Sequence, residues 1–161
     1  MSLWRMFLEK NVFLMYEQSK KTQQGELNMK FVKTWEEKGV TIPAPFARNI
    51  KVFFAPDKEG VNELTFTHAL IYPESQTDYH KHDRGELIYI VSGRGIAICE
   101  GKEMPIEPDV VMWIEKDEMH QMKNTGNETL KLATVFIPAY TAEFNYSRCL
   151  EAASKLQSDA K

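Results

Sequence analysis

Short runs of β-branched and aromatic residues, separated by turn residues, dominate the chain from about Met29 onward. Turn pairs such as Ser92-Gly93, Glu100-Gly101 and Lys116-Asp117 separate them. Strands at intervals of about 8–12 residues with such turns predict an all-β sandwich or a closed barrel. The predicted strands cover residues 49–54, 63–72, 86–91, 95–99, 110–114, 121–123 and 129–137.

Both ends of the chain have a different pattern. In residues 1–28 apolar side chains recur at helical spacing, which predicts an amphipathic leader helix that packs on the barrel or on a partner subunit. A second interpretation makes Met29 the natural start, with the leader loosely attached. Residues 141–161 also show helical spacing and predict a helical tail outside the barrel, which leaves residues 29–140 for the barrel itself.

Composition narrows the functional classes. A formal net charge of -3 without a basic block argues against nucleic-acid binding. No apolar run approaches the roughly 20 residues of a membrane-spanning helix, and Glu9-Lys10 interrupts the apolar centre that a signal peptide needs. The two cysteines, Cys99 and Cys149, lie far apart, so we expect no disulfide framework and a cytoplasmic protein.

Three of the four histidines belong to one candidate site. On a strand, side chains two residues apart share a face, so His80 and His82 point the same way. The turn at Asp83-Arg84-Gly85 allows Glu86 to point back into the same space. Two imidazoles and a carboxylate can hold zinc, copper, iron, nickel or manganese. The alternative is that the polar string HKHDRGE is an exposed, solvated loop.

The spacing of these residues resembles the two motifs of the cupin superfamily. The first motif, G(x)5HxH(x)3-4E(x)6G, is matched from His80 through Glu86 to Gly93. The second, G(x)5PxG(x)2H(x)3N, ends in a pair that His120 and Asn124 reproduce. The resemblance covers residues 46–138 and implies a double-stranded β-helix, or jelly-roll, barrel. It also implies one divalent metal ion, held by His80, His82, Glu86 and His120.

The chain departs from both motifs at positions that are not metal ligands. Glu74 replaces the leading glycine of the first motif. Asp109, Glu115 and Asp117 replace the glycine, proline and glycine of the second. Asp117 is expected to be tolerated, since Asp adopts left-handed turn conformations better than most residues.

Several other side chains have weaker functional interpretations. His68 lies on an apolar strand face and is expected to be a hydrogen-bonded core residue rather than a ligand. Arg48 and Arg94 have the geometry to bind a substrate carboxylate, although a surface position is the simpler expectation for each. Asn124 is expected to stabilise the turn at Thr125-Gly126, and Cys99 to be a buried strand residue. Ile88, Ile90 and Met122 are expected to form apolar walls around the metal.

The resemblance implies a metal-dependent enzyme that acts on a small oxygen-rich molecule, such as an organic acid, a sugar or an aromatic diol. Two coordination positions would stay open on a six-coordinate ion. Cupins with such sites include dioxygenases, and hence oxidoreductases, as well as isomerases and decarboxylases or lyases, and the fold does not choose among them. The alternative function is a non-enzymatic cupin that senses or stores a small ligand. A homodimer is expected, because a second subunit commonly covers the edge strands of cupin sheets.

Overall fold

The computed structural model describes residues 29–159, and residues 33–159 belong to the unit considered below. All seven predicted strands are present within these residues, with ends that differ by at most two residues. The strands are β1 (Val40–Ile42), β2 (Arg48–Phe54), β3 (Thr65–Ile71), β4 (Gly85–Ser92), β5 (Gly95–Cys99), β6 (Lys102–Ile106), β7 (Val111–Ile114), β8 (His120–Asn124) and β9 (Leu130–Ile137). The predicted tail helix is α2 (Ala142–Asp159), and the predicted leader helix lies outside the described residues.

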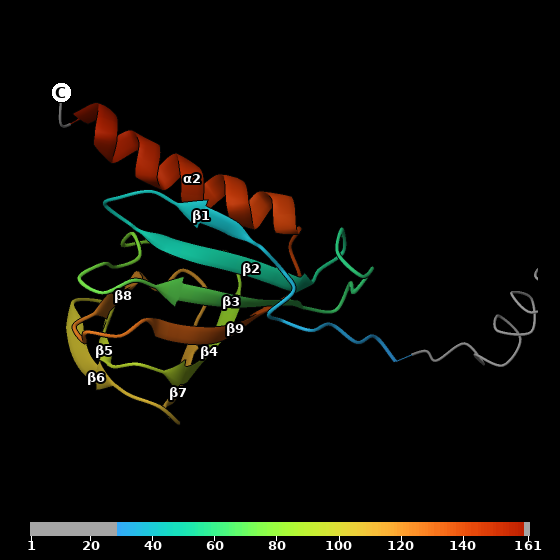
Figure 1. Ribbon diagram of the computed structural model, residues 1–161, viewed down its shortest axis with the longest axis horizontal. Helices are drawn as coiled ribbons and strands as arrows, with labels where there is room; N and C mark the ends of the chain where they lie inside the picture. The colour runs from blue at the N-terminus through green and yellow to red at the C-terminus, as the bar shows by residue number, and fades with distance from the viewer. Residues whose placement is uncertain (1–28, 160–161) are drawn as a thin grey trace, which may run out of the picture. The chain divides into compact units, whose positions relative to one another are not determined.

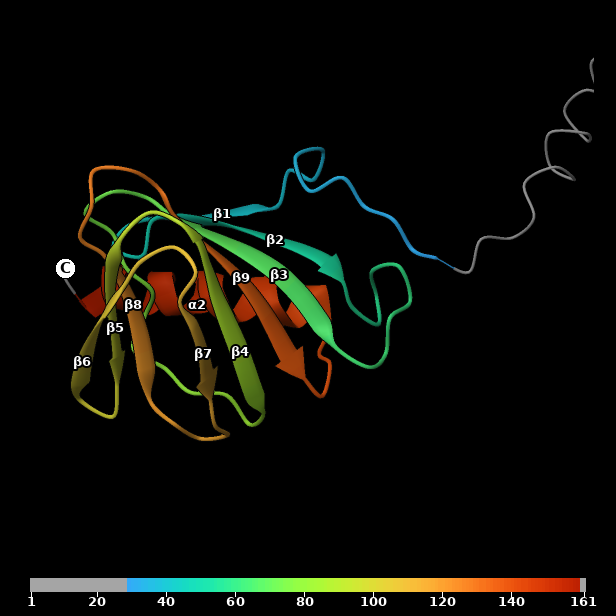
Figure 2. The same ribbon diagram turned by 90° about the horizontal axis from the view of Figure 1, so that it is seen from below.

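The strands form two antiparallel sheets that face each other (Figures 1 and 2). The larger sheet has the order β1-β2-β3-β9-β4-β7, and the smaller one the order β6-β5-β8. Because strands distant in sequence alternate within the larger sheet, the chain crosses between the sheets as a jelly roll does. The all-β jelly-roll prediction is therefore confirmed. No helix in the described part of the chain is long and apolar enough to cross a bilayer.

The core between the sheets consists of the inward-facing side chains of both. On β4 the alternation directs Glu86, Ile88 and Ile90 inward, and all three are buried. Ile88 and Ile90 pack with Met122 from the opposite sheet and with six further buried apolar residues. Glu86 thus lies on the same face of β4 as the apolar core residues. It lies at the start of the strand, where polar side chains line the barrel.

Helix α2 is fixed at its start and packed along its length. The Asp57 carboxylate accepts hydrogen bonds from the backbone N–H groups of Ala142 (2.7 Å) and Glu143 (3.2 Å), and Thr141 Oγ1 accepts one from Phe144 (3.1 Å). Such caps satisfy the unpaired N–H groups of the first turn. Further along, Cys149 and Ala153 pack against a buried apolar cluster that includes Ile42 and Ile50 of β1 and β2. Figure 1 shows α2 lying along these two strands.

Two strands were not predicted from the sequence, and each lacks the alternating pattern. β6 exposes four of its five residues and contains Pro105, so its sequence has no apolar face. It is an edge strand, where proline and charged side chains are tolerated. β1 has only three residues and pairs with β2 alone. Pairing with a neighbour, rather than local pattern, makes both segments strands.

The motif positions that lack glycine nevertheless keep the backbone conformation that favours glycine. Glu74 (φ 61°), Asp109 (φ 71°) and Asp117 (φ 66°) all lie in the left-handed region. Aspartate reaches this region at lower cost than most residues, which confirms the expectation for Asp117. The turns of both motifs are thus conserved in conformation although three of their glycines are replaced.

Gly93, by contrast, cannot be replaced without a clash. It has φ 85°, and an added Cβ would lie 2.7 Å from both Leu130 Cα and Thr129 O. Gly101 has a similar φ of 76° but nothing within 4 Å of its Cβ position. The two glycines therefore share a left-handed conformation, but only Gly93 lacks room for a side chain.

We expect Gly93→Ala to lower the free energy of unfolding by about 1–3 kcal/mol more than Gly101→Ala, because only the first substitution forces backbone atoms apart. Urea denaturation of the two variants and the wild type measures this difference. Equal losses of stability in the two variants would show that left-handed strain alone explains the effect at Gly93.

Candidate metal centre

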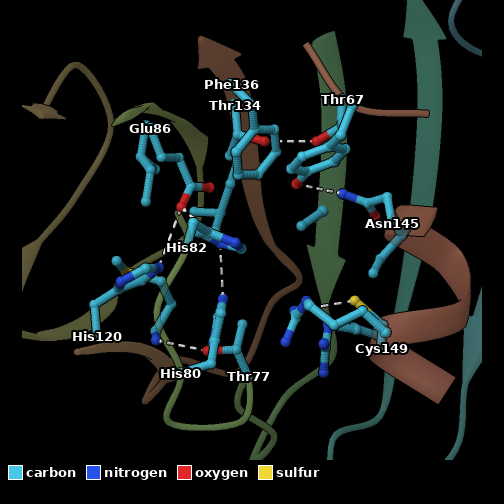
Figure 3. A pocket seen from close by; sticks show the side chains of 18 residues that line it. Thr67, Thr77, His80, His82, Glu86, His120, Thr134, Phe136, Asn145 and Cys149 are labelled. Carbon is cyan, nitrogen blue, oxygen red and sulfur yellow. Dashed lines mark hydrogen bonds and ion pairs between the residues drawn. The ribbon is translucent and has the colours of Figure 1, made fainter. Parts of the chain in front are cut away.

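The four predicted ligands come together at one end of the barrel (Figure 3). His80 lies outside the named strands but pairs with the first residue of β8. Its N–H donates to the His120 carbonyl (3.0 Å), and its own carbonyl accepts from the His120 N–H (2.7 Å). His82 follows two residues later, and Glu86 lies on β4. Backbone pairing thus brings the HxH segment beside His120, and the turn after His82 returns Glu86 to the same place.

The side-chain atoms of these residues converge on one point. His80 Nε2 lies 3.1 Å from His82 Nε2. Glu86 Oε2 lies 3.3 Å from His82 Nε2 and 3.1 Å from His120 Nε2. One nitrogen from each of the three histidines lies within 4.8 Å of the others. Three imidazoles and one carboxylate oxygen therefore surround a common centre.

Backbone carbonyls orient two of the rings. His80 Nδ1 lies 2.8 Å from the Asp78 carbonyl oxygen, and His120 Nδ1 lies 2.9 Å from that of Glu118. A carbonyl oxygen can only accept, so each Nδ1 carries the proton and each Nε2 presents its lone pair. This arrangement fixes the tautomer in which imidazole can coordinate a metal. Both lone pairs point toward the shared centre.

The donor set fits a divalent metal ion. Ligand atoms bound at about 2.1 Å lie about 3.0–3.4 Å apart in neighbouring positions of one ion, and the observed separations are 3.1 and 3.3 Å. Glu86 Oε2 and His120 Nε2 are close enough for an ion pair, yet both are buried without a hydrogen-bond partner among the described residues. Such atoms are costly unless a partner such as a cation satisfies them. A metal ion between them would do so.

Charge and burial keep the carboxylate ionised and His80 neutral. Burial raises the pKa of Glu86, but its contacts with His120 and His82 outweigh this and lower the pKa to about 2. Burial, together with the positive charge of Arg148, lowers the pKa of His80 to about 3. The pKa of His120 is lowered by burial, but contact with Glu86 raises it overall. An anionic oxygen and a neutral imidazole are the forms that bind metals.

The alternative of an exposed HKHDRGE loop does not describe this segment. His82 is 7% exposed and Glu86 5% exposed, and His120 is also buried. The polar string reads like a surface loop because Lys81 and Asp83, which alternate with the inward side chains, are exposed.

A small cavity of about 50 Å³ adjoins the cluster. Ile88 and Met122 form part of its apolar wall, as predicted, while Ile90 belongs to the core and not to the cavity lining. The cavity lining thus combines the polar histidines with apolar side chains.

The turn after β8 is held as expected. Asn124 Oδ1 accepts a hydrogen bond from the Gly126 N–H (3.0 Å).

The remaining sequence candidates fall outside the ligand cluster. His68 lies against the rings of Phe53 and Phe66, with centroid distances of 4.7 and 5.6 Å, and burial lowers its pKa to about 4. It is a core residue, although these contacts are with aromatic rings rather than the expected hydrogen-bond partner. Arg94 is exposed and pairs with Glu107. Cys99 is partly buried, and neither it nor Cys149 forms a disulfide.

The expectation of a surface position for Arg48 is wrong. This side chain is almost fully buried and lines the cavity. Its guanidinium donates to the Phe46 carbonyl (3.0 Å) and to Asp78 Oδ1 (3.1 Å). The alternation of β2, which directs Arg48, Ile50 and Val52 inward, contained the signal for this position.

Among the residues not identified from the sequence are Tyr140, Asn145 and Arg148, which line the cavity, and Asp78, which pairs with Arg48 and Arg148. Asp78 lies two residues before His80, so the alternation that linked His80 to His82 also pointed to it. The other three come from α2 or the segment just before it, and Figure 3 shows Asn145 and Cys149 projecting from the helix toward the cavity. Local pattern carries no signal for this placement, because it depends on how α2 packs on the barrel.

Comparison with known proteins agrees with this architecture. The cupin domain family matches residues 68–136, which include all four candidate ligands. The chain is 34% identical over 73 residues to the oxalate-binding protein of Thermotoga maritima, covering 45% of this chain and 60% of that protein. It is 31% identical over 94 residues to an L-ectoine synthase of Vibrio cholerae, covering 58% of this chain and 65% of the relative. The chain thus spans less than two thirds of each.

Solved structures share the fold at low sequence identity. A predicted oxalate decarboxylase from Thermotoga maritima superposes with a TM-score of 0.60 and 24% identity, over 68% of this chain and 99% of the other. An RmlC-like cupin from Shewanella frigidimarina gives a TM-score of 0.57 and 14% identity, over 72% and 96%. The family match identifies residues 68–136 as a cupin domain, and the solved structures share its jelly-roll fold.

Proposed function

We propose that the chain binds one divalent metal ion through His80, His82, Glu86 and His120. The observation that carries this proposal is the convergence of their four side-chain atoms at 3.1–3.3 Å around a buried centre. The carbonyl contacts of His80 and His120 hold both rings in the tautomer that coordination needs. Manganese, iron, zinc, nickel and copper all accept this set of nitrogen and oxygen donors.

We further propose that the chain is an enzyme acting on a small oxygen-rich molecule, such as an organic acid, a sugar or an aromatic diol. A bound divalent ion would act as a Lewis acid at coordination positions that the protein leaves open. The protein's own part is to hold Glu86 as an anion, to keep His80 neutral and to enclose the ligand in a small cavity. The relationship to ectoine synthases, which are enzymes, supports this proposal. Dioxygenase, isomerase, and decarboxylase or lyase chemistry are the reaction types to test.

The second candidate function is binding without turnover, as a sensor or a store of a small ligand. One observation favours it: a relative at 34% identity is named an oxalate-binding protein, a name that describes binding and not a reaction. The two functions share the metal site and differ in whether a bound ligand is converted.

Protein purified without added metal is expected to contain about one transition-metal ion per chain, measured by elemental analysis. His82→Ala and His120→Ala should each lower this occupancy at least tenfold, because each removes a ligand from the cluster. His68→Ala is the matched control, since it removes a buried histidine outside the cluster. Full occupancy in the His82 and His120 variants would refute the site.

Glu86→Gln separates the two candidate functions. It keeps the size of the side chain and one oxygen donor but removes a negative charge beside the metal. Metal affinity should fall by about 10–100-fold, while an enzyme should lose turnover by a further hundredfold or more at saturating metal. Exposed Glu63→Gln is the control. A metal-loaded wild type that binds organic acids but converts no acid, sugar or diol, with or without oxygen, would favour the binder instead.

A homodimer is our proposal for the assembly, supported by apolar side chains on the outer face of β4 and β7. Tyr89 of β4 lies opposite Val111 of the edge strand β7, and Leu87 lies opposite Trp113. Val111 is 61% exposed and Trp113 is 49% exposed. Contiguous exposed apolar residues beside an unpaired strand edge are typical of a surface that a second subunit covers.

Trp113→Lys is therefore expected to shift the protein from dimer to monomer in sedimentation velocity. A buried lysine would cost more than the association gains. Trp35→Lys is the matched control, because Trp35 is an exposed tryptophan in the turn before β1. A monomeric wild type, or a dimer unaffected by Trp113→Lys, would refute this assignment of the interface.

A further inference from the structure

Arg148 of α2 reaches the cavity from the side opposite the barrel strands. Its Nη1 donates to Asp78 Oδ2 (2.7 Å) and its Nη2 lies 3.2 Å from Cys149 Sγ. Its positive charge acts on His80 and His120, and it lines the same cavity as both. The helix therefore places a guanidinium group beside the proposed metal site.

Apart from Glu86, which faces the histidines, the charged groups beside the cavity carry a net positive charge. Arg48 and Arg148 share the single carboxylate of Asp78. Asp78 Oδ1 lies 3.1 Å from Arg48 Nη2 and its Oδ2 lies 2.7 Å from Arg148 Nη1, so the carboxylate pairs with both guanidinium groups as an anion with one negative charge. Two guanidinium groups against one carboxylate leave one positive charge. Glu86 does not neutralise it, because its charge faces the metal site.

The two arginines differ in what their N–H groups are free to do. Arg48 is buried and donates to a carbonyl and a carboxylate, so its function is to hold Asp78 in place. Arg148 donates to the same carboxylate with one nitrogen, while its other contact is a thiol, which is a weak acceptor. Its side chain is 24% exposed. Arg148 is therefore the arginine better placed to bind a ligand, because it is partly exposed and one of its two acceptors is weak, whereas Arg48 is buried against two oxygen acceptors.

A second free donor lies next to Arg148. The Tyr140 hydroxyl accepts a hydrogen bond from Asn145 Nδ2 (2.8 Å), which leaves its own proton available. Burial, and then the charge of Glu86, raise the pKa of Tyr140 well above its usual value, so the hydroxyl stays protonated. Asn145 Oδ1 is buried and has no partner among the described residues. Arg148, Tyr140 and Asn145 all line the cavity. Hydrogen-bonding groups on its α2 side are therefore available to a ligand.

Arg148 also lines an outer groove of about 620 Å³ between α2 and the segment before His80. Its ion-pair partner Asp78 lines this groove and not the inner cavity. The groove also holds Glu151 and Lys155, whose opposite charges cancel. Arg148 thus borders both the outer groove and the cavity that the histidines line.

We propose that α2 supplies the carboxylate-recognition half of the site. Arg148 binds the carboxylate of a small organic acid whose other oxygen atoms face the histidine cluster, and the Tyr140 hydroxyl donates a further hydrogen bond to it. This inference rests on the proposed metal-dependent function and selects organic acids from the three substrate classes given above. Planar guanidinium groups match carboxylates in geometry and charge, which is the reason to assign this role to Arg148.

The test is calorimetric titration of the manganese-loaded protein with oxalate, which has carboxylates, and with catechol, which has oxygen donors but no carboxylate. Arg148→Gln should weaken oxalate binding by about 10–100-fold and catechol binding by less than threefold. Arg148→Lys, which keeps the charge but loses the planar fork, should weaken oxalate binding by about 3–10-fold. Arg94→Gln removes an exposed arginine and should change neither.

Metal content and melting temperature are measured for every variant, so that loss of metal or of fold is recognised. Equal losses for oxalate and catechol in Arg148→Gln, or no loss of oxalate binding, would overturn the carboxylate role of Arg148. A wild type that binds catechol but not oxalate would overturn it too, and would leave the proposed metal function intact. A metal-loaded wild type that binds neither probe would overturn both.

Discussion

The reciprocal backbone bonds between His80 and His120 are the contact on which the site depends. They join a segment outside the named strands to the first residue of β8, and so bring together two parts of the chain that are 40 positions apart. The same pairing places the rings 4.5 Å apart between centroids. Because each ring is held through its Nδ1 by a carbonyl two residues earlier, the backbone determines the direction of each lone pair. Backbone contacts therefore set the orientation of both rings.

Most of the barrel and the ligand set could be predicted from the sequence because both depend on short-range pattern. Alternation identified seven strands, and the spacing from His80 to Glu86 identified residues that a single turn brings together. β6 escaped prediction because an edge strand can be polar on both faces. The burial of Arg48 was not predicted, because most charged side chains are exposed. Its position in the alternation of β2 pointed inward instead. The position of Arg148 depends on packing between α2 and the barrel, which no local pattern encodes.

Asp78 shows how a buried charge can organise a cavity. Its carboxylate joins Arg48 of β2 to Arg148 of α2, and its backbone carbonyl orients His80. Burial of three charged groups is tolerated because each has a partner at hydrogen-bond distance. The apolar contacts of Cys149 and Ala153 with β1 and β2 keep α2 in register with this network. Packing on one face of the helix thus determines where its arginine lies relative to the histidines.

Glu74, Asp109 and Asp117 have left-handed backbone conformations at positions where the motifs have glycine. This affects how relatives of this chain are recognised from sequence. A non-glycine residue with positive φ strains the folded state by about 1 kcal/mol, but it also restricts the unfolded chain, which offsets about 0.4–1 kcal/mol of that cost. At Asp109 and Asp117 the two effects nearly cancel, so selection can exchange glycine for aspartate with little change in stability. A motif written in residue letters rejects such a chain, whereas one written in backbone conformation accepts it. Sequences that lack these glycines but keep the HxH, Glu and His spacing therefore belong in any census of this fold.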